Sequence, residues 1–133
     1  MNAIFIDTAG FLALWNARDQ WNERATEVFV DLMGRGEDFC TSSYIMLECG
    51  NAAARQPFRR DVIEVREQFL ADGKLIIPGA DDEAAAWKVF ARGHAADAGI
   101  VDHISFTIMR RLGITRAFTN DRHFRAAGFE TLF

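Results

Sequence analysis

The stretch Ala3-Ile4-Phe5-Ile6-Asp7-Thr8 is an apolar run that ends abruptly at an acidic residue. Its four consecutive apolar residues predict a strand buried on both faces, as the strands of parallel sheets are. Arg116-Ala117-Phe118-Thr119 is a second short strand-like run, and it ends at Asn120-Asp121. We therefore expect two strands whose carboxyl ends each carry an aspartate.

Between and around these runs, helical spacing of apolar residues alternates with further short apolar runs. We expect strands at 39–41, 74–77 and 129–133, helices at 8–15, 21–33, 44–55, 57–71, 81–92 and 100–112, and a polar loop at 93–99. Strands that alternate with helices of this length are typical of an α/β domain with a mainly parallel sheet. We predict one such domain over residues 1–133, with about five strands.

The composition excludes several other classes of protein. With 50% hydrophobic and 26% charged residues in 133, the chain is neither disordered nor collagen-like. No run approaches the roughly 18 to 20 apolar residues of a membrane span, and no basic residue precedes Arg18. We therefore expect a cytoplasmic protein without a membrane partner.

Neither the cysteines nor the overall charge identifies a function. Cys40 and Cys49 lack the spacing of a metal site or a disulfide framework and are interpreted as ordinary thiols. The net charge of −4 argues against a broadly basic nucleic-acid-binding surface. Residues 91–133 nevertheless carry six basic and four acidic side chains, so a local anion-binding surface remains possible.

Acidic residues that interrupt or adjoin apolar segments are the candidate functional residues; they are Asp7, Glu48, Asp102 and Asp121. Neighbouring strand ends converge at one edge of a parallel sheet, where function is usually found. Carboxylates gathered there repel one another unless a cation neutralises them, and hard oxygen ligands select Mg²⁺ or Mn²⁺. The pattern favours a metal site suited to phosphodiester cleavage.

Each of these acids also has an ordinary interpretation when it is taken alone. Asp7 and Asp121 can cap helices or shape turns, and Glu48 can face solvent. Asp102 can simply complement the dipole at the start of its helix. The functional hypothesis depends on the acids being brought together.

The sequence resembles the PIN domain family, in particular the VapC-type toxin ribonucleases of bacterial toxin–antitoxin pairs. The matching stretches are residues 4–8, 41–51, 97–114 and 119–129. The resemblance implies a three-layer α/β/α domain and a metal-dependent endoribonuclease whose catalytic, metal-binding acids are Asp7, Glu48, Asp102 and Asp121. It also implies that a metal-activated water cleaves structured RNA, either tRNA or rRNA, and that the partners are an antitoxin and a second copy of the chain.

Supporting roles follow for a second set of residues. Thr8, Asn51, Asp97 and Thr119 are candidates for orienting the carboxylates or, for Asp97, for ordering a loop. The RNA-binding candidates are Arg55, Arg59 and Arg60 at one helix junction, and Arg92 and Arg122 elsewhere. The histidines His94, His103 and His123 are not assigned to catalysis, and His123 is expected to order its loop. The sequence departs from the usual family pattern at Ala9, Gly99 and Val101.

Two other functions remain open at this point. Asp7 at a strand end could be the nucleophile of a phosphotransfer enzyme, although Ala9 stands where such enzymes carry a second aspartate. The chain could also be a catalytically silent module that only sequesters a partner.

Overall fold

A computed structural model describes residues 2–93, 95 and 97–133. Its centre is a five-stranded parallel sheet in the order β3-β2-β1-β4-β5. The strands are β1 (Ala3–Ile6), β2 (Asp38–Ser42), β3 (Leu75–Ile76), β4 (Arg116–Phe118) and β5 (Glu130–Thr131). The helices are α1 (Thr8–Trp15), α2 (Asn22–Gly34), α3 (Ser43–Ala53), α4 (Arg59–Ala71), α5 (Ala80–Ala91), α6 (Ile100–Leu112) and α7 (Arg122–Ala126).

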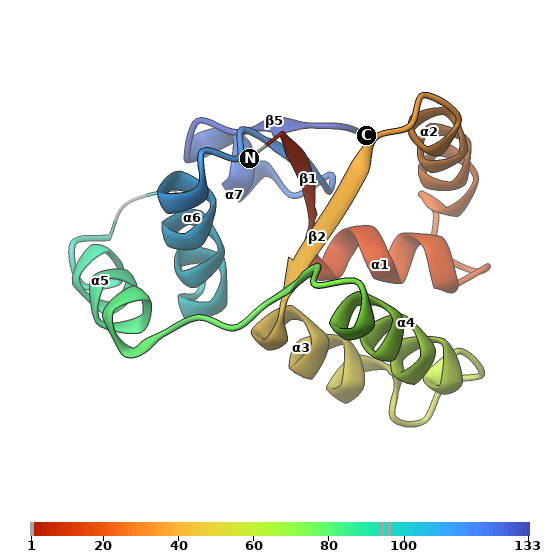
Figure 1. Ribbon diagram of the computed structural model, residues 1–133, viewed down its shortest axis with the longest axis horizontal. Coiled ribbons are helices and arrows are strands. Elements are labelled where there is room, and N and C mark those ends of the chain that lie inside the picture. The colour runs from red at the N-terminus through yellow and green to blue at the C-terminus, as the bar shows by residue number, and fades with distance from the viewer. Residues whose placement is uncertain (1, 94, 96) are drawn as a thin grey trace.

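Strands are added to the sheet first on one side of β1 and then on the other. From β1 the sheet grows through β2 to β3, after which the chain crosses to β4 on the other side of β1 and continues to β5. Because parallel crossovers are right-handed, this reversal places α1 to α4 on one face of the sheet and α5 to α7 on the other. Figure 1 shows the two groups of helices on opposite sides of the strands. The expected three-layer α/β fold is confirmed, with a topological switch point between β1 and β4.

The start of α1 packs unusually closely against β4. The backbone N–H of Asp7 donates to the carbonyl oxygen of Phe118 at 3.4 Å. A Cβ atom at Gly10 would lie only 2.1 Å from that same oxygen. The absence of a side chain at Gly10 therefore lets α1 begin directly over the end of β4.

The C-terminal end of α6 is bonded to α5 and is closed by a glycine. Arg111 forms a bidentate ion pair with Asp82, at 2.8 and 2.9 Å, which ties α6 to α5. Gly113 ends α6 in the left-handed conformation, at φ 70°. The ion pair therefore ties the last turn of α6 to the first turn of α5.

The sequence-based boundaries differ from the structure mainly at the ends of elements. The last strand covers Glu130–Thr131 rather than 129–133, and Pro57 precedes α4 instead of lying in its first turn. The short helix α7 is not predicted by the sequence; its five residues are too few for an apolar period to be visible. Within the described ranges, no helix is long and apolar enough to cross a membrane.

Gly10 and Gly50 make a matched pair of glycines for testing this close approach. We expect Gly10→Ala to lower the free energy of unfolding by about 3 kcal/mol or more, because the added methyl group meets the backbone of Phe118. Gly50→Ala, in the middle of α3 with open space around it, should raise it by about 0.5–1 kcal/mol. Urea unfolding of both variants measures this, and equal effects would contradict the proposed packing.

Candidate active site

Asp7 is the buried centre of the site. It follows the last residue of β1 and is the N-cap residue of α1, yet its side chain makes no capping hydrogen bond. Its side chain instead accepts a hydrogen bond from Thr119 Oγ1, which lies 3.1 Å from Oδ2. At 3% exposure, this carboxylate is almost completely removed from solvent. A side chain that is so buried, and is not used as a cap, calls for another role.

Thr119 connects the two strand ends that carry aspartates. Its hydroxyl donates to Asp7 and accepts from the backbone N–H of Asp121, at 3.1 Å in each case. The residue is fully buried, so both contacts are sheltered from competing water. Thr119 therefore fixes the position of the Asp121 backbone relative to the Asp7 carboxylate.

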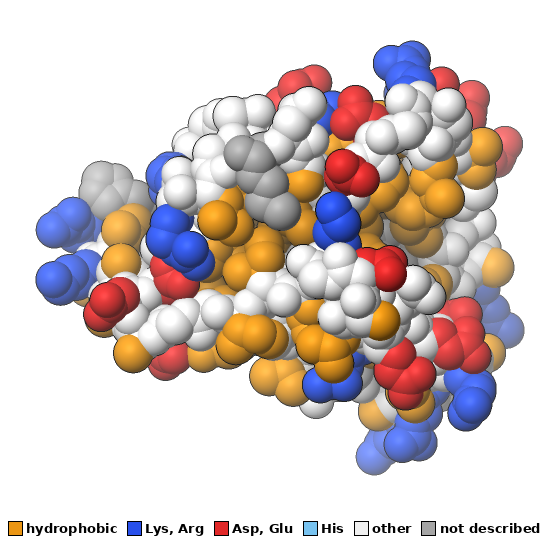
Figure 2. Space-filling view, in the orientation of Figure 1, with side chains coloured by type: hydrophobic (Ala, Val, Ile, Leu, Met, Phe, Trp, Pro, Cys, Tyr) orange, Lys and Arg blue, Asp and Glu red, His pale blue; other side chains and the backbone are white. Residues whose placement is uncertain are grey.

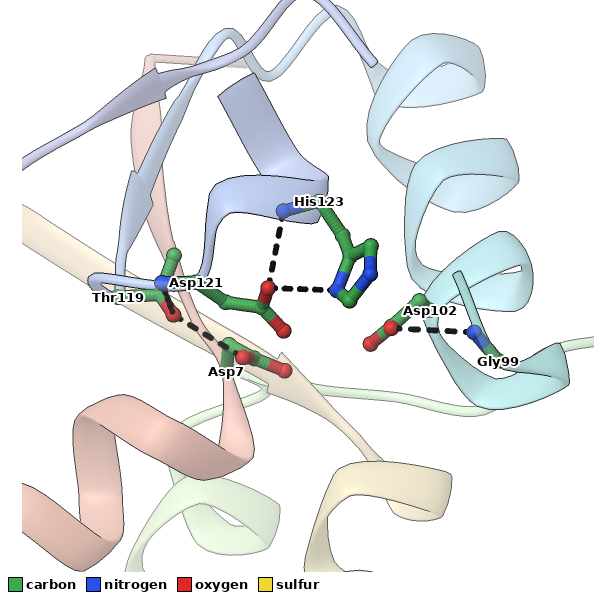
Figure 3. A network of polar contacts seen from close by, with 6 residues as sticks. All are labelled: Asp7, Gly99, Asp102, Thr119, Asp121 and His123. Carbon is green, nitrogen blue, oxygen red and sulfur yellow. Dashed lines mark hydrogen bonds and ion pairs between the residues drawn. The ribbon is translucent and has the colours of Figure 1, made fainter. Parts of the chain in front are cut away.

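Asp121 is fixed in turn by the start of α7. Its Oδ1 atom accepts hydrogen bonds from the backbone N–H of His123 at 2.9 Å and from the His123 ring nitrogen Nδ1 at 2.7 Å. Asp121 is thus a helix cap, as its ordinary interpretation had it, and also a member of the acidic group. Figure 3 shows its carboxylate facing the space shared with Asp7 and Asp102.

Asp102 reaches the same space from the opposite side, in the first turn of α6. Its Oδ2 accepts from the backbone N–H of Gly99 at 3.4 Å, which holds the carboxylate at the helix start. Ligand atoms of Asp102, Asp121 and His123 all lie within 4.8 Å of one another. These three residues form a compact group that could hold a metal ion.

Glu48 approaches from α3, on the other face of the sheet. Thr8 Oγ1 donates to Glu48 Oε1 at 2.6 Å, which joins the second turn of α3 to the first turn of α1. Glu48 is half-buried rather than turned fully to solvent. The predicted pairing of Thr8 with a site carboxylate is therefore present as a direct contact.

The electrostatics show that these acids influence one another. Burial and then the charge of Asp102 raise the pKa of Asp7 to about 7, and Asp121 adds to the effect. Burial and then the charges of Asp121 and Glu48 raise the pKa of Asp102 to about 6. Because their negative charges raise each other's pKa values, these carboxylates form one electrostatically coupled site. Such a site favours a nearby cation.

The donor set suits a hard divalent cation. Most of its possible ligand atoms are carboxylate oxygens, which bind Mg²⁺ and Mn²⁺ well. The raised pKa values of Asp7 and Asp102 mean that a positive charge would be accepted with a gain in stability. The residues therefore fit such an ion by their chemistry.

Two of the predicted supporting residues are not brought into the group. Asn51 lies exposed on α3, and Asp97 lies exposed in the loop before α6, where it adopts a left-handed conformation with φ 69°. Neither side chain hydrogen-bonds to another residue in the described part of the chain. His94, which the sequence does not assign to catalysis, lies outside the described residues.

The candidate RNA-binding arginines are all exposed, at the junction of α3 and α4, at the end of α5 and at the start of α7; they are Arg55, Arg59, Arg60, Arg92 and Arg122. On the face shown in Figure 2, most Lys and Arg side chains stand around the rim rather than together at the centre. Two other arginines of the basic C-terminal part, Arg111 and Arg116, are engaged in ion pairs with Asp82 and Glu37.

His123 has a place in the site that the sequence does not predict. It is expected to order its loop, and its contacts with Asp121 agree with that. A ring nitrogen of His123 also lies among the possible ligand atoms of Asp102 and Asp121, which was not expected. Its position two residues after Asp121, at the start of a helix, would have been the available signal.

Comparisons with known proteins identify the family and agree with the fold. The sequence profile of the PIN domain matches residues 4–130. The 23S rRNA-specific endonuclease VapC20 from two Mycobacterium tuberculosis strains, CDC 1551/Oshkosh and H37Rv, is 30% identical over 95% of both chains. The crystal structure of Mycobacterium tuberculosis VapC20, described as a sarcin-ricin loop cleaving toxin, matches with a TM-score of 0.81 and 28% identity over 96% of each chain.

A more distant solved structure shares the fold alone. The structure of FitAB bound to the IR36 DNA fragment matches with a TM-score of 0.71 and 18% identity. The match covers 96% of this chain and 92% of that chain.

The raised pKa of Asp7 predicts a pH-dependent effect of Asp7→Asn on stability. The folded protein holds this proton up to about pH 7, whereas the unfolded chain releases it at about pH 3.9. The stability that the protonated Asp7 contributes is therefore complete below about pH 4 and is lost as the pH rises towards 7. With chelator present, we expect Asp7→Asn to match the wild type at about pH 4 and to be more stable by about 4 kcal/mol at about pH 8.

Urea unfolding at a series of pH values measures this difference. Glu64→Gln on α4 is the matched control, because Glu64 is exposed and pairs with the exposed Arg60. A difference between Asp7→Asn and the wild type that stays constant with pH would show that Asp7 is not held protonated.

Proposed function

The chain belongs to the PIN domain family, and we propose that it is a metal-dependent endoribonuclease that acts as the toxin of a toxin–antitoxin pair. The observation that carries this proposal is the meeting of Asp7, Asp102 and Asp121 at the switch point of the sheet. Their carboxylates face one space, and two of them have pKa values raised by burial and by their neighbours. Such a group has little use in a protein that only binds a partner.

In this proposal the four acids hold one or two divalent cations. Asp7, Asp102 and Asp121 supply ligands from the sheet and α6, and Glu48 supplies one from α3. When bound, a divalent cation lowers the pKa of a coordinated water and stabilises negative charge on phosphate oxygens. Thr119 and Thr8 keep Asp7 and Glu48 in the orientations that present their remaining oxygens to the site.

The proposed substrate is the RNA of the large ribosomal subunit. This choice rests on VapC20, which is similar along almost the whole chain and is named for cleaving 23S rRNA. Transfer RNA is the alternative substrate of the same class. The exposed arginines at the junction of α3 and α4, with Arg92 and Arg122, are proposed to contact the phosphates.

The proposed partners are an antitoxin protein and a second copy of the chain in the cytoplasm. An antitoxin could silence the site by placing an Arg against the carboxylates, because a guanidinium matches their geometry and neutralises their charge. The FitAB match supports only the fold and does not assign this chain a partner.

The phosphotransfer alternative has less support from the site. An aspartate that acts as a nucleophile needs an accessible carboxylate, whereas Asp7 is 3% exposed and one of its oxygens accepts from Thr119. The alternative of a catalytically silent binding module does not explain why the acidic side chains lie together. We therefore retain the nuclease as the single proposed function.

Cleavage of purified ribosomes, 23S rRNA and a tRNA pool tests the proposed activity. We expect discrete cuts in the large-subunit RNA with Mg²⁺ or Mn²⁺, and none with excess chelator. Asp7→Asn, Glu48→Gln, Asp102→Asn and Asp121→Asn should each lower the cleavage rate by at least about 10²-fold, because each removes a charge that the cation requires.

Glu27→Gln serves as the control, since it removes an exposed acid of α2 that pairs with Arg24, which is not one of the proposed RNA-binding arginines. It should cleave as the wild type does. Equal cleavage by the wild type and Asp7→Asn would point to a contaminating nuclease, and cuts confined to tRNA would replace the proposed substrate.

The salt dependence of RNA binding tests the arginines. In an Asp7→Asn background, we expect the triple variant Arg55→Ala, Arg59→Ala, Arg60→Ala to bind RNA more weakly. Its slope of log affinity against log salt should become shallower by about 0.7–0.9 for each phosphate that the variant no longer touches. Arg24→Ala with Arg35→Ala, in α2 and at its C-cap, is the control pair, because both arginines are exposed and lie outside the proposed RNA-binding set. An unchanged slope in the triple variant would exclude that cluster, and Arg92→Ala with Arg122→Ala tests the other.

A further inference from the structure

We propose that a hollow at the far end of α1 binds one nucleobase of the RNA substrate, which stacks on Trp15 and donates an amino hydrogen to Asp61. The hollow lies between the end of α1 and the turn that joins α3 to α4, and its volume is about 320 Å³. The inference rests on the proposed ribonuclease function and deepens it. It adds a site that reads a base to the site that cuts the backbone.

Two helices connect the hollow to the acidic site. Helix α1 begins directly after Asp7 and ends at Trp15, while α3 carries Glu48 and ends shortly before Gln56. Trp15 lies about 10 Å along the axis of α1 from Thr8, whose hydroxyl contacts Glu48. Figure 1 shows α1, α3 and α4 together on this side of the sheet. One RNA strand can therefore reach both sites, with the base in the hollow a few nucleotides from the cleaved phosphate.

Aromatic rings form the apolar side of the hollow. Trp15 stacks on Phe11 with 4.9 Å between the ring centroids, and its contact with Phe58 is looser, at 6.4 Å. Phe11 and Phe58 are buried, whereas Trp15 is partly exposed. A partly exposed indole that its neighbours hold in place is a suitable stacking surface for a base, because little side-chain freedom is lost on binding.

The polar groups of the hollow match the edge of a base. Asp61 lies exposed in the first turn of α4, and its carboxylate can only accept hydrogen bonds. It therefore suits the exocyclic amino group of cytosine, adenine or guanine, which uracil lacks. Gln56 adds an amide that both donates and accepts. An apolar protein segment in the same place would leave these groups without partners.

Arginines lie in the hollow and beside it. Arg18 lines it, and Arg55 and Arg59 adjoin the lining residues of the turn between α3 and α4. None of these three arginines forms an ion pair with a carboxylate of the described residues. Their charge outweighs that of Asp61 and favours a ligand with phosphates. A base on a phosphate backbone satisfies both the rings and these charges.

The size of the hollow favours a base over a segment of a partner protein. A volume of about 320 Å³ is at the lower end of the range for small-ligand sites. Such a volume suits a single ring system. An amphipathic helix needs a longer apolar groove, because it places several side chains along its length.

Binding of short RNA strands tests the site, in an Asp7→Asn background so that the RNA is not cut. The probes are cytidine and uridine strands of about 10 nucleotides, and a strand of the same length with a sugar–phosphate backbone and no bases. The variants are Trp15→Leu, which removes the ring, Trp15→Phe, which keeps one, and Asp61→Ala. Trp87→Leu is the matched control, because Trp87 is an exposed tryptophan of α5 outside the lining of the hollow.

We expect Trp15→Leu to weaken binding of the cytidine strand about tenfold and to change binding of the base-free strand little, because stacking requires a base. The salt dependence should stay the same, since no charge is removed. Trp15→Phe should keep most of the affinity, and Trp87→Leu all of it. The Asp7→Asn parent should bind the cytidine strand about threefold more tightly than the uridine strand, and Asp61→Ala should remove most of that difference.

Circular dichroism and urea unfolding establish that each variant is folded. If Trp15→Leu binds the cytidine strand as its parent does, the inference is overturned and the hollow belongs to another ligand, such as a segment of the antitoxin. Equal weakening for the base-free strand would also overturn it, because Trp15 would then act only through the fold. Asp61 is exposed, so Asp61→Ala tests the site even where Trp15→Leu does not fold. An unchanged preference for cytidine in Asp61→Ala would overturn the contact with the amino group.

These outcomes are separate from those that test the proposed function. Cleavage of 23S rRNA that depends on the four acids would leave the nuclease in place even where the hollow binds no base. If the wild type cuts no RNA and the Asp7→Asn parent binds none of the strands, the function and the inference fail together.

Discussion

The mutual repulsion of buried carboxylates is the constraint on which the rest of the site depends. Asp7 and Asp102 hold their protons well above the usual pKa range because burial and neighbouring acids disfavour their charges. A fold that keeps them together must supply rigid attachments for each one. The site is accordingly built where separate elements end or begin, with each acid fixed by a backbone or hydroxyl group.

The attachments form one connected series of contacts between α1 and the end of β4. Gly10 allows α1 to start over the carbonyl of Phe118, which accepts from the N–H of Asp7. One residue beyond Phe118, the Thr119 hydroxyl links the Asp7 carboxylate to the N–H of Asp121. Because the path runs through buried groups, a change in packing at α1 would be transmitted to the carboxylates without touching them.

Much of this arrangement could be predicted from the sequence. Asp7 and Asp121 follow apolar runs, and the convergence of parallel strand ends brings such residues together; the fold and the contacts of Thr8 and Thr119 agree with that expectation. The short helix α7 could not be predicted, because five residues show no period. The place of His123 depends on α7 and was missed for the same reason. Asn51 lies one turn after Glu48 on the same side of α3, but this spacing does not tell whether the second residue also reaches the site.

The same charge argument links stability, substrate binding and inhibition. A group of repelling carboxylates also repels the phosphates of RNA, so the site can accept its proposed substrate only when a cation offsets its charge. An ion bound there would stabilise the fold and make the site able to accept a phosphate at the same time. A guanidinium from an antitoxin would neutralise the same carboxylates, but it has no coordinated water to activate. The repulsion that the fold must overcome is thus the feature that would let a metal switch the site on and a partner's arginine switch it off.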